Sequence, residues 1–190
     1  MTDSFYRQEE LIKLGFHEIG DNIQISRKAS FYDTSRISIG NNVRIDDFAL
    51  LSGNIILKNN IHISAGAFLF AGDAGIEMDD FSALSSRVAV YAISDDFSGE
   101  SLVNSTIDEK YRNVTKAKVV IGKHVVVGTG STVLPGTVIG EGCAIGAMSL
   151  VNKSTQPWSI YAGIPCRLIR KRSKKMLELE KEFLDSDFSD

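Results

Sequence analysis

The sequence predicts an all-β fold in which the chain winds into a solenoid of short parallel strands, and two spacings carry this prediction. An aliphatic residue recurs at every sixth position without a break from Ile121 to Val151. A second residue, usually small, stands four positions after each of the first five aliphatics. Six residues make one short strand plus one turn, a period that neither an α-helix nor an alternating strand produces. The aliphatic positions are Ile121, Val127, Val133, Ile139, Ile145 and Val151, and the second positions are Val125, Ser131, Thr137, Cys143 and Ser149.

Three such units make one triangular coil, in which the aliphatic positions of successive coils stack and each rung is buried by its neighbours. The same frame, less regular, fits the N-terminal half of the chain. We therefore expect roughly 18 rungs, or about six coils, between residues 19 and 154. The solenoid domain as a whole is assigned to residues 19–172. Its N-terminal rungs are Ile19, Ile25, Phe31, Ile39, Ile45, Leu51, Leu57, Ile63, Leu69, Met78, Leu84 and Val90.

Short helices are expected at both ends of the solenoid. Residues 4–15 place apolar side chains at helical spacings, with Ser4 as a possible N-cap and Gly15 as a stop, so residues 1–18 form an N-terminal capping segment. Residues 173–190 supply a second helix, with an apolar face up to Leu184, followed by a frayed acidic tail. We expect the two helices to close the two open ends of the solenoid.

One segment, residues 94–118, breaks the six-residue period completely. A stretch of about 25 residues without the period has to leave the solenoid as a loop. A long loop on a rigid scaffold usually carries function, and the alternative is a disordered excursion. Apolar side chains favour an ordered loop, because they can anchor it. These are Phe97, Leu102, Ile107, Tyr111 and Val114.

The composition is that of an ordinary globular protein. The chain has 190 residues, of which 43% are hydrophobic, and a net charge of −3, so nucleic acid is not an expected partner. The N-terminus lacks a basic region followed by an apolar run, and no stretch of 18 apolar residues occurs. We therefore expect no membrane span and a cytoplasmic location. Cys143 stands at a small inward position, where a thiol packs as a compact hydrophobe.

Three features together resemble the hexapeptide-repeat acyltransferases, over residues 19–172. They are the regular rungs from Ile121 to Val151, the loop that opens after Tyr91, and the ending from Trp158 to Arg167. The resemblance is closest to the branch of maltose and galactoside O-acetyltransferases and the acetyltransferases of surface-polysaccharide biosynthesis. It implies a left-handed parallel β-helix, a homotrimer, and acetyl-CoA bound in a groove between neighbouring subunits. The implied reaction transfers acetyl to a hydroxyl or amine of a sugar or nucleotide sugar.

In that branch the loop opens with a Tyr and then a His that acts as general base, and here the His position, aligned on Tyr91, falls on Asp95. A carboxylate is a much weaker base than imidazole unless burial or the adjacent Asp96 raises its pKa. Asp95 is thus a candidate catalytic residue, and a turn-forming or solvated Asp is the alternative. Tyr91, Asp96 and Phe97, at the same loop opening, are the candidate contacts to the acceptor.

His62 and His124, both at outward positions of their rungs, are the other candidate bases, although a lone outward His is more often solvated. The missing loop His also bears on the acceptor. An alcohol benefits from a general base when it attacks a thioester, whereas an amine only has to arrive neutral and well oriented. The sequence therefore favours an amine acceptor without settling the choice.

The candidate contacts to CoA lie in the late coils. The backbone at Gly128, Gly130 and Ala147 has little or no side chain to keep a pantetheine arm away, although glycine also serves simply to make corners. By the resemblance, Arg167 and Arg170 offer guanidinium groups for the CoA phosphates, and a solvated basic stretch is the alternative. Another such contact, Trp158, would pack near the adenine or cover the last coil.

Two rival interpretations remain. The γ-class carbonic anhydrases share the β-helix but bind zinc through three histidines, and His17, His62 and His124 are scattered too widely for such a site. We therefore expect no metal. The other rival is a non-catalytic trimeric β-helix that serves as a binding or scaffold protein, motivated by the missing loop His. Binding of acetyl-CoA separates this scaffold from an enzyme.

Overall fold

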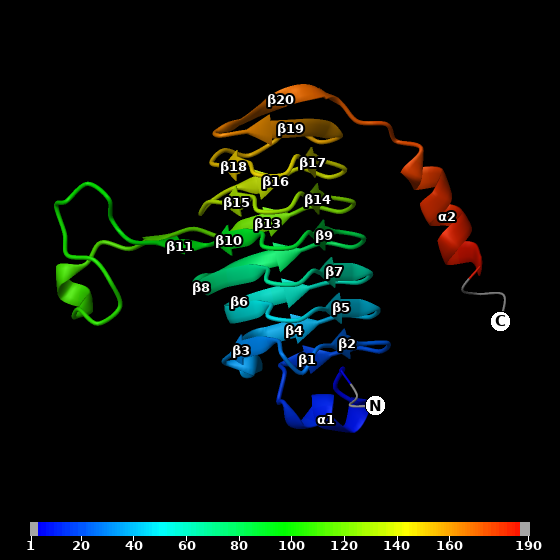
Figure 1. Cartoon of the computed structure of the whole chain (residues 1–190), viewed down its shortest axis with the longest axis horizontal. Helices are drawn as coiled ribbons and strands as arrows, with labels where there is room; N and C mark the ends of the chain where they lie inside the picture. The colour runs from blue at the N-terminus through cyan, green and yellow to red at the C-terminus, as the bar shows by residue number, and fades with distance from the viewer. Residues whose placement is uncertain (1–3, 187–190) are drawn as a thin grey trace.

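The computed structural model describes residues 4–186 and shows a stack of triangular coils with a helix below the first coil (Figure 1). Each coil contributes one short strand to each of three flat faces, and all pairings along the stack are parallel until the last strand. The predicted solenoid of parallel strands is confirmed. Among residues 4–186, no helix is both long enough and apolar enough to cross a membrane.

The three faces are named in the order in which the chain visits them. The first face contains β1 (Glu18–Ile19), β4 (Ile37–Ile39), the ends of β6 (Leu50–Leu57) and β8 (Phe68–Met78), β13 (Val119–Ile121) and β16 (Val138–Ile139). The second face contains β2 (Gln24–Ile25), β5 (Val43–Ile45), β7 (Ile61–Ile63), β9 (Ala83–Leu84), β14 (Val126–Val127), β17 (Ala144–Ile145) and β19 (Ser159–Gly163). The third face contains β3 (Ser30–Tyr32), the starts of β6 and β8, β10 (Ala89–Tyr91), β15 (Thr132–Val133) and β18 (Leu150–Val151).

The predicted rungs form the core. On the second face, strand pairing places Ile45 beside Ile63 and Val127 beside Ile145, so the aliphatic positions stack in register. Of the predicted aliphatic positions, all but Ile19 and Phe31 are buried. Those two exceptions belong to the first coil, which has a neighbouring coil on one side only. A fully buried aliphatic contributes about 1.5–3 kcal/mol, so the stack supplies ample core for one domain.

The corner between the first and second faces carries a continuous column of left-handed residues, here called the corner column. It begins with asparagines, whose amides hydrogen-bond from Asn22 to Asn42 and from Asn42 to Asn60. Asparagine tolerates a positive φ, and its side chain can also bond to the next coil. Above the asparagines the column continues with aromatic rings and one glycine, and the Phe81 ring stacks on the His124 imidazole. The members are Asn22, Asn42, Asn60, Phe81, His124, Gly142 and Trp158.

The N-terminal helix is present but shorter than expected. α1 (Gln8–Lys13) has Arg7 rather than Ser4 at its N-cap, and it buries Leu11 beneath the first coil. Gly15 follows it with a φ of +70°, in agreement with the predicted stop. The expected cap on the first coil is thus confirmed with different bounds.

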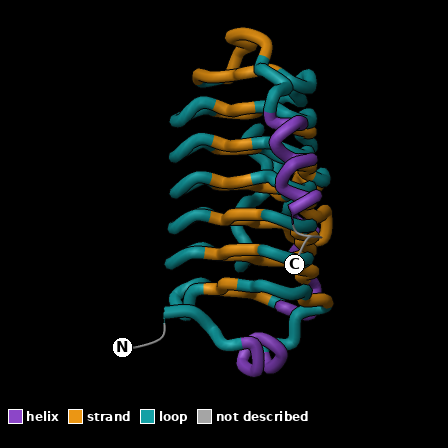
Figure 2. Tube along the Cα trace, turned by 90° about the vertical axis from the view of Figure 1, so that its right-hand side faces the viewer, coloured by secondary structure: helices purple, strands orange, loops and turns teal. Residues whose placement is uncertain are grey.

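The C-terminal helix does not close the far end, so that prediction is wrong. The last coil is instead covered by an antiparallel hairpin of β19 and β20 (Cys166–Lys171). α2 (Met176–Ser186) runs back along the side of the stack, beside the corner column (Figures 1 and 2). It lies there because Phe183 packs edge-on against Phe81 and the Glu180 carboxylate meets the His124 imidazole.

Residues 94–118, here called the arm, leave the solenoid as predicted and project to one side (Figure 1). At its base β11 (Ile93–Ser94) pairs antiparallel with β12 (Thr115–Lys116). Short 3-10 helices are η2 (Glu109–Tyr111) within the arm and η1 (Thr34–Arg36) in the first coils. The expectation that the arm's apolar side chains anchor it is wrong for three of the five within this chain, because Phe97 is 94% exposed and Leu102 and Tyr111 are also exposed.

Candidate active site

The base of the arm presents one carboxylate without a partner. Asp95 follows β11, and its backbone oxygen accepts a hydrogen bond from the Ser94 hydroxyl. Within residues 4–186 its carboxylate takes part in no hydrogen bond or ion pair. Tyr91, predicted to contact the acceptor, lies at the end of β10 with its ring stacked on Phe70 at 5.1 Å between centroids. The arrangement leaves Asp95 available to a substrate.

The neighbouring carboxylate, Asp96, is already committed to the arm. It accepts hydrogen bonds from the Ser98 amide at 2.9 Å, the Ser98 hydroxyl at 2.8 Å and the Ser101 hydroxyl at 2.7 Å. These bonds lower the pKa of Asp96 to about 2. Asp96 therefore holds the first turn of the arm as an ion, while Phe97, next along the chain, projects into solvent.

The expectation that His124 is solvated is wrong. His124 is 7% exposed, stacked on Phe81 and hydrogen-bonded through Nε2 to Glu180 at 2.9 Å. The same carboxylate pairs with Lys123. Burial raises the pKa of Glu180, but the bonds from Lys123 and His124 outweigh it and hold that pKa below its ordinary value. Nε2 of His124 is thus already bonded to Glu180 of α2, and this favours a structural role for His124 over that of a general base.

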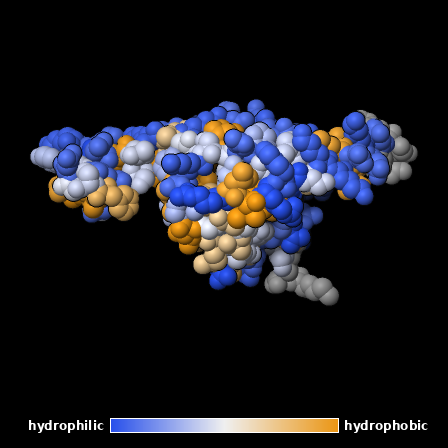
Figure 3. Space-filling view, turned by 90° about the horizontal axis from the view of Figure 1, so that it is seen from above, coloured by the Kyte–Doolittle hydropathy of each residue, from blue (hydrophilic) through white to orange (hydrophobic). Residues whose placement is uncertain are grey.

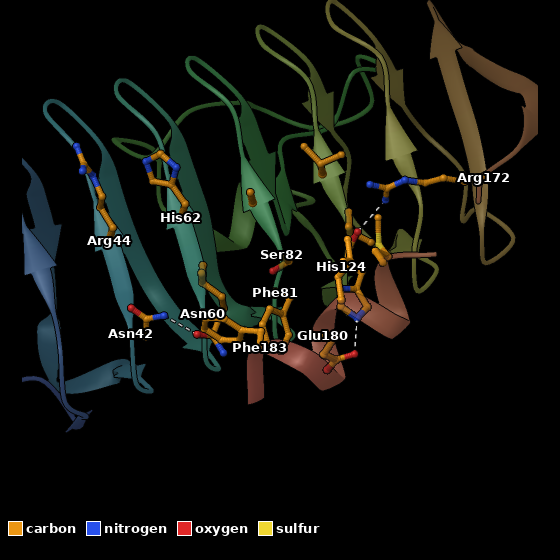
Figure 4. Close-up of a pocket in the computed structure, with 16 residues that line it drawn as sticks. Asn42, Arg44, Asn60, His62, Phe81, Ser82, His124, Arg172, Glu180 and Phe183 are labelled. Carbon is orange, nitrogen blue, oxygen red and sulfur yellow. Dashed lines mark hydrogen bonds and ion pairs between the residues drawn. The ribbon is translucent and has the colours of Figure 1, made fainter. Parts of the chain in front are cut away.

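The other candidate base, His62, lies in a polar cluster on the second face. Its Nε2 is 2.8 Å from Oδ2 of Asp46, and Nε of Arg44 donates to Oδ1 of the same carboxylate at 2.8 Å. Burial alone would raise the pKa of Asp46, and the bonds from His62 and Arg44 lower it below its ordinary value. The cluster faces a groove of about 680 Å³ between the second face and α2 (Figure 4).

The candidate CoA contacts in the late coils share the corner between the second and third faces. Backbone amides join this corner from coil to coil, from Ser85 to the Val127 carbonyl and from Gly128 to the Ile145 carbonyl. A Cβ at Gly128 would lie 2.6 Å from the Ala147 nitrogen, and one at Gly130 2.6 Å from the Met148 sulfur. Packing between coils therefore accounts for both glycines. Ala147 itself is exposed beside them.

The remaining candidates lie on or beside the closing hairpin. Arg167 and Arg170 are exposed on β20, and within the described chain neither guanidinium pairs with a carboxylate. Seen from above, the molecule shows apolar patches among polar side chains (Figure 3), and on the closing hairpin Ile164 and Leu168 are exposed. Trp158 is only 9% exposed, lies in the corner column and has Lys174 over its ring. Packing over the last coil thus describes Trp158 better than contact with adenine.

The two sets of candidates lie at different corners of the solenoid. Asp95 is at the arm, whereas the column of Ser85, Gly128 and Ala147 follows the second face, and β10 lies between them. The sequence analysis did not single out Ser85, which follows an aliphatic rung at the position that Gly128 occupies in a later coil. Among residues 4–186, no group of three or more His, Cys, Asp or Glu side chains could hold a metal ion.

Comparison with known proteins places these features in a family. The model of the bacterial transferase hexapeptide (six repeats) family matches residues 118–153. A dTDP-4-amino-4,6-dideoxy-D-glucose acyltransferase of Escherichia coli is 42% identical over 184 residues, which cover 95% of each chain. The chain belongs to the hexapeptide-repeat acyltransferases. The expected family and left-handed β-helix are confirmed, and the chain is an acyltransferase.

Solved structures agree with this family assignment. AntD, an N-acyltransferase from Bacillus cereus, was solved with dTDP and 3-hydroxybutyryl-CoA. It is 52% identical, with a TM-score of 0.97, over 99% of this chain and 100% of its own. A maltose O-acetyltransferase from Clostridium difficile 630 is 20% identical with a TM-score of 0.53, over 92% of this chain and 79% of its own, and shows the shared fold alone. This hexapeptide-repeat acyltransferase is thus more similar to this N-acyltransferase than to the maltose enzyme.

Proposed function

We propose that this protein transfers the acyl group of a CoA thioester to an amine of a nucleotide sugar. The observation that carries the proposal is the similarity, along nearly the whole chain, to AntD, whose structures hold CoA together with dTDP-4-amino-4,6-dideoxyglucose. The residues here are consistent with an amine, because Asp95 stands where the related O-acetyltransferases carry a basic His. An amine needs orientation more than it needs a strong base.

The proposed reaction is direct attack in a ternary complex. The neutral amine attacks the thioester carbonyl, a C–N bond forms, and the C–S bond breaks to release CoA. The Asp95 carboxylate, which has no partner within the described chain, would accept a hydrogen bond from the amine and orient its lone pair. The proton that nitrogen loses is finally needed by the departing CoA thiolate, so the step requires no net acid or base.

We further propose that each site lies between two copies of the chain in a homotrimer. Solved variants of AntD replace a serine or an aspartate, spaced along that chain as Ser85 and Asp95 are here. Since β10 separates Ser85 from Asp95 within one copy, the two residues would meet one acceptor only if a neighbouring copy supplied the second. Phe97 and Leu102 on the arm, exposed in a single copy, would then be covered by the neighbour.

The acyl group and the location belong to the same proposal. AntD was solved with 3-hydroxybutyryl-CoA, so acetyl and a larger hydroxyacyl group are both candidates here. We retain the cytoplasm as the proposed location, because the cysteines Cys143 and Cys166 are free and buried, as suits a compartment that keeps thiols reduced.

The test measures release of the CoA thiol from acetyl-CoA and 3-hydroxybutyryl-CoA across dTDP-aminosugars, simple aminosugars and hydroxyl sugars. We expect turnover with a dTDP-aminosugar and at most about a hundredth of it with a hydroxyl sugar, the range that a missing general base spans. Preferred turnover of a hydroxyl sugar would contradict N-acyl transfer. A protein that binds no CoA thioester by calorimetry would support the scaffold alternative instead.

A further inference from the structure

The groove between the second face and α2 is large enough for a substantial ligand and has two unlike walls. Its volume of about 680 Å³ lies within the range of small-molecule sites. Phe81 and Phe183, together with Leu179 of α2, form an apolar wall. Arg44 and His62 project from neighbouring strands β5 and β7 along the opposite wall (Figure 4). These two walls suit a ligand that joins a flat, weakly polar group to an anion.

The polar wall is prepared for an anion. Asp46 holds Nε of Arg44 and Nε2 of His62, so both side chains are fixed in direction. Their exposed fractions are 52% and 44%, and within residues 4–186 the two terminal nitrogens of Arg44 make no hydrogen bond. A guanidinium fork of this kind matches the paired oxygens of a phosphate.

The last asparagine of the corner column, Asn60, lies inside the same groove. Its Oδ1 accepts a hydrogen bond from the Asn42 amide, but the next member of the corner column is Phe81, whose side chain has no acceptor. The side-chain amide nitrogen of Asn60 is therefore left without a partner in the described chain. It lies beside the apolar wall (Figure 4), where it can donate to a carbonyl of a flat ring.

We infer that this groove binds the nucleoside diphosphate part of the acceptor, with a pyrimidine base beside Asn60 and the diphosphate at Arg44 and His62. Strand pairing supports this orientation of the ligand, in which the sugar points toward Ser85. His62 lies beside Ala83, and the Ser64 amide donates to the Leu84 carbonyl at 2.9 Å, so Ser85 lies one coil above the end of β7. A sugar that extends from the diphosphate along β7 thus reaches Ser85. The inference rests on the proposed function and adds where the acceptor is held.

The test is calorimetric titration of the full chain with dTDP and, separately, with CoA. The variants are Arg44→Gln and Asn60→Ala, and the matched control is Arg27→Gln, which removes an arginine outside the groove. We expect Arg44→Gln to weaken dTDP binding about tenfold or more, as loss of a phosphate fork does, with CoA affinity unchanged. Asn60→Ala should weaken dTDP but leave the affinity for inorganic pyrophosphate unchanged.

Kinetics with a dTDP-aminosugar give a second readout: Arg44→Gln should raise the KM for the aminosugar with little change in kcat. Equal dTDP binding by wild type and both variants would overturn the groove assignment while leaving the proposed function intact. Wild-type protein that binds CoA but no dTDP would overturn both the groove assignment and the nucleotide-sugar acceptor. A chain that binds neither ligand would overturn the proposed function itself.

Discussion

The carboxylate of Asp95 has no hydrogen-bond or ion-pair partner within residues 4–186, whereas that of Asp96 is bound to Ser98 and Ser101. We predict that Asp95→Asn lowers kcat for an aminosugar about tenfold, because a neutral amide accepts a weaker hydrogen bond from the amine than a carboxylate does. This is less than the roughly 100-fold or more that a general base contributes, since Asp95 is proposed only to orient the amine. CoA affinity should stay the same. Steady-state kinetics together with calorimetry check this prediction, and an unchanged kcat would remove Asp95 from the reaction.

Residue type alone did not predict which candidate histidine is buried and which is exposed. His62 and His124 occupy equivalent outward positions in the sequence frame, yet only His124 lies beneath α2, against Glu180. No local spacing predicts the contact between His124 and Glu180, because the two residues are 56 positions apart in the sequence. The proposed role of Ser85 was not predicted either, because a serine in a corner is typical of an ordinary turn.

At the scale of elements, the strands could be predicted because a buried stack repeats its own pattern in the sequence. The packing position of α2 and the direction in which the arm projects could not be predicted. Both have apolar residues without a period that says what covers them, and α2 packs along the side of the stack instead of over its end. The groove is likewise invisible in sequence, because β5, β7 and α2 supply it from distant segments.

The arm can be tested as a separable element, since β11 and β12 close its base. Replacing residues 97–113 by a short glycine-serine linker should leave the stack of coils, followed by circular dichroism, and CoA binding nearly unchanged. We predict that acyl transfer falls at least about a hundredfold, because the acceptor loses its positioning group and its cover. Retained activity in the shortened protein would show that the arm is dispensable for the reaction.

The docking of α2 is predicted to depend on pH through Glu180. Hydrogen bonds from Lys123 and His124 lower the pKa of Glu180 below the ordinary value of 4.5. Docking therefore gains stability above that ordinary value and loses it as pH falls through the lowered pKa. Glu180→Gln should remove this dependence and speed amide exchange in α2 about tenfold at neutral pH. Exchange that matches wild type at every pH would refute the contact, and Glu178→Gln serves as the matched control.

For the whole molecule, the stack of coils is a rigid scaffold that presents its two sets of candidate site residues at different corners. The Ser85 column and the proposed nucleotide groove border the second face, whereas Asp95 and the arm lie beyond β10. Because the coils fix this separation, one copy cannot close on itself to bring the two sets together. We therefore propose that neighbouring copies complete each other's sites.

Complementation between two inactive variants tests that claim most directly. Ala147→Trp fills the exposed corner next to Gly128 and should block CoA binding at that corner of its own copy. The shortened-arm protein keeps this corner intact and lacks the arm. Co-expressed with different affinity tags and mixed at random, the two should recover about a quarter of wild-type activity, because each mixed trimer holds one intact cleft. Mixed trimers, verified by mass, that remain as inactive as either variant alone would contradict a site shared between copies.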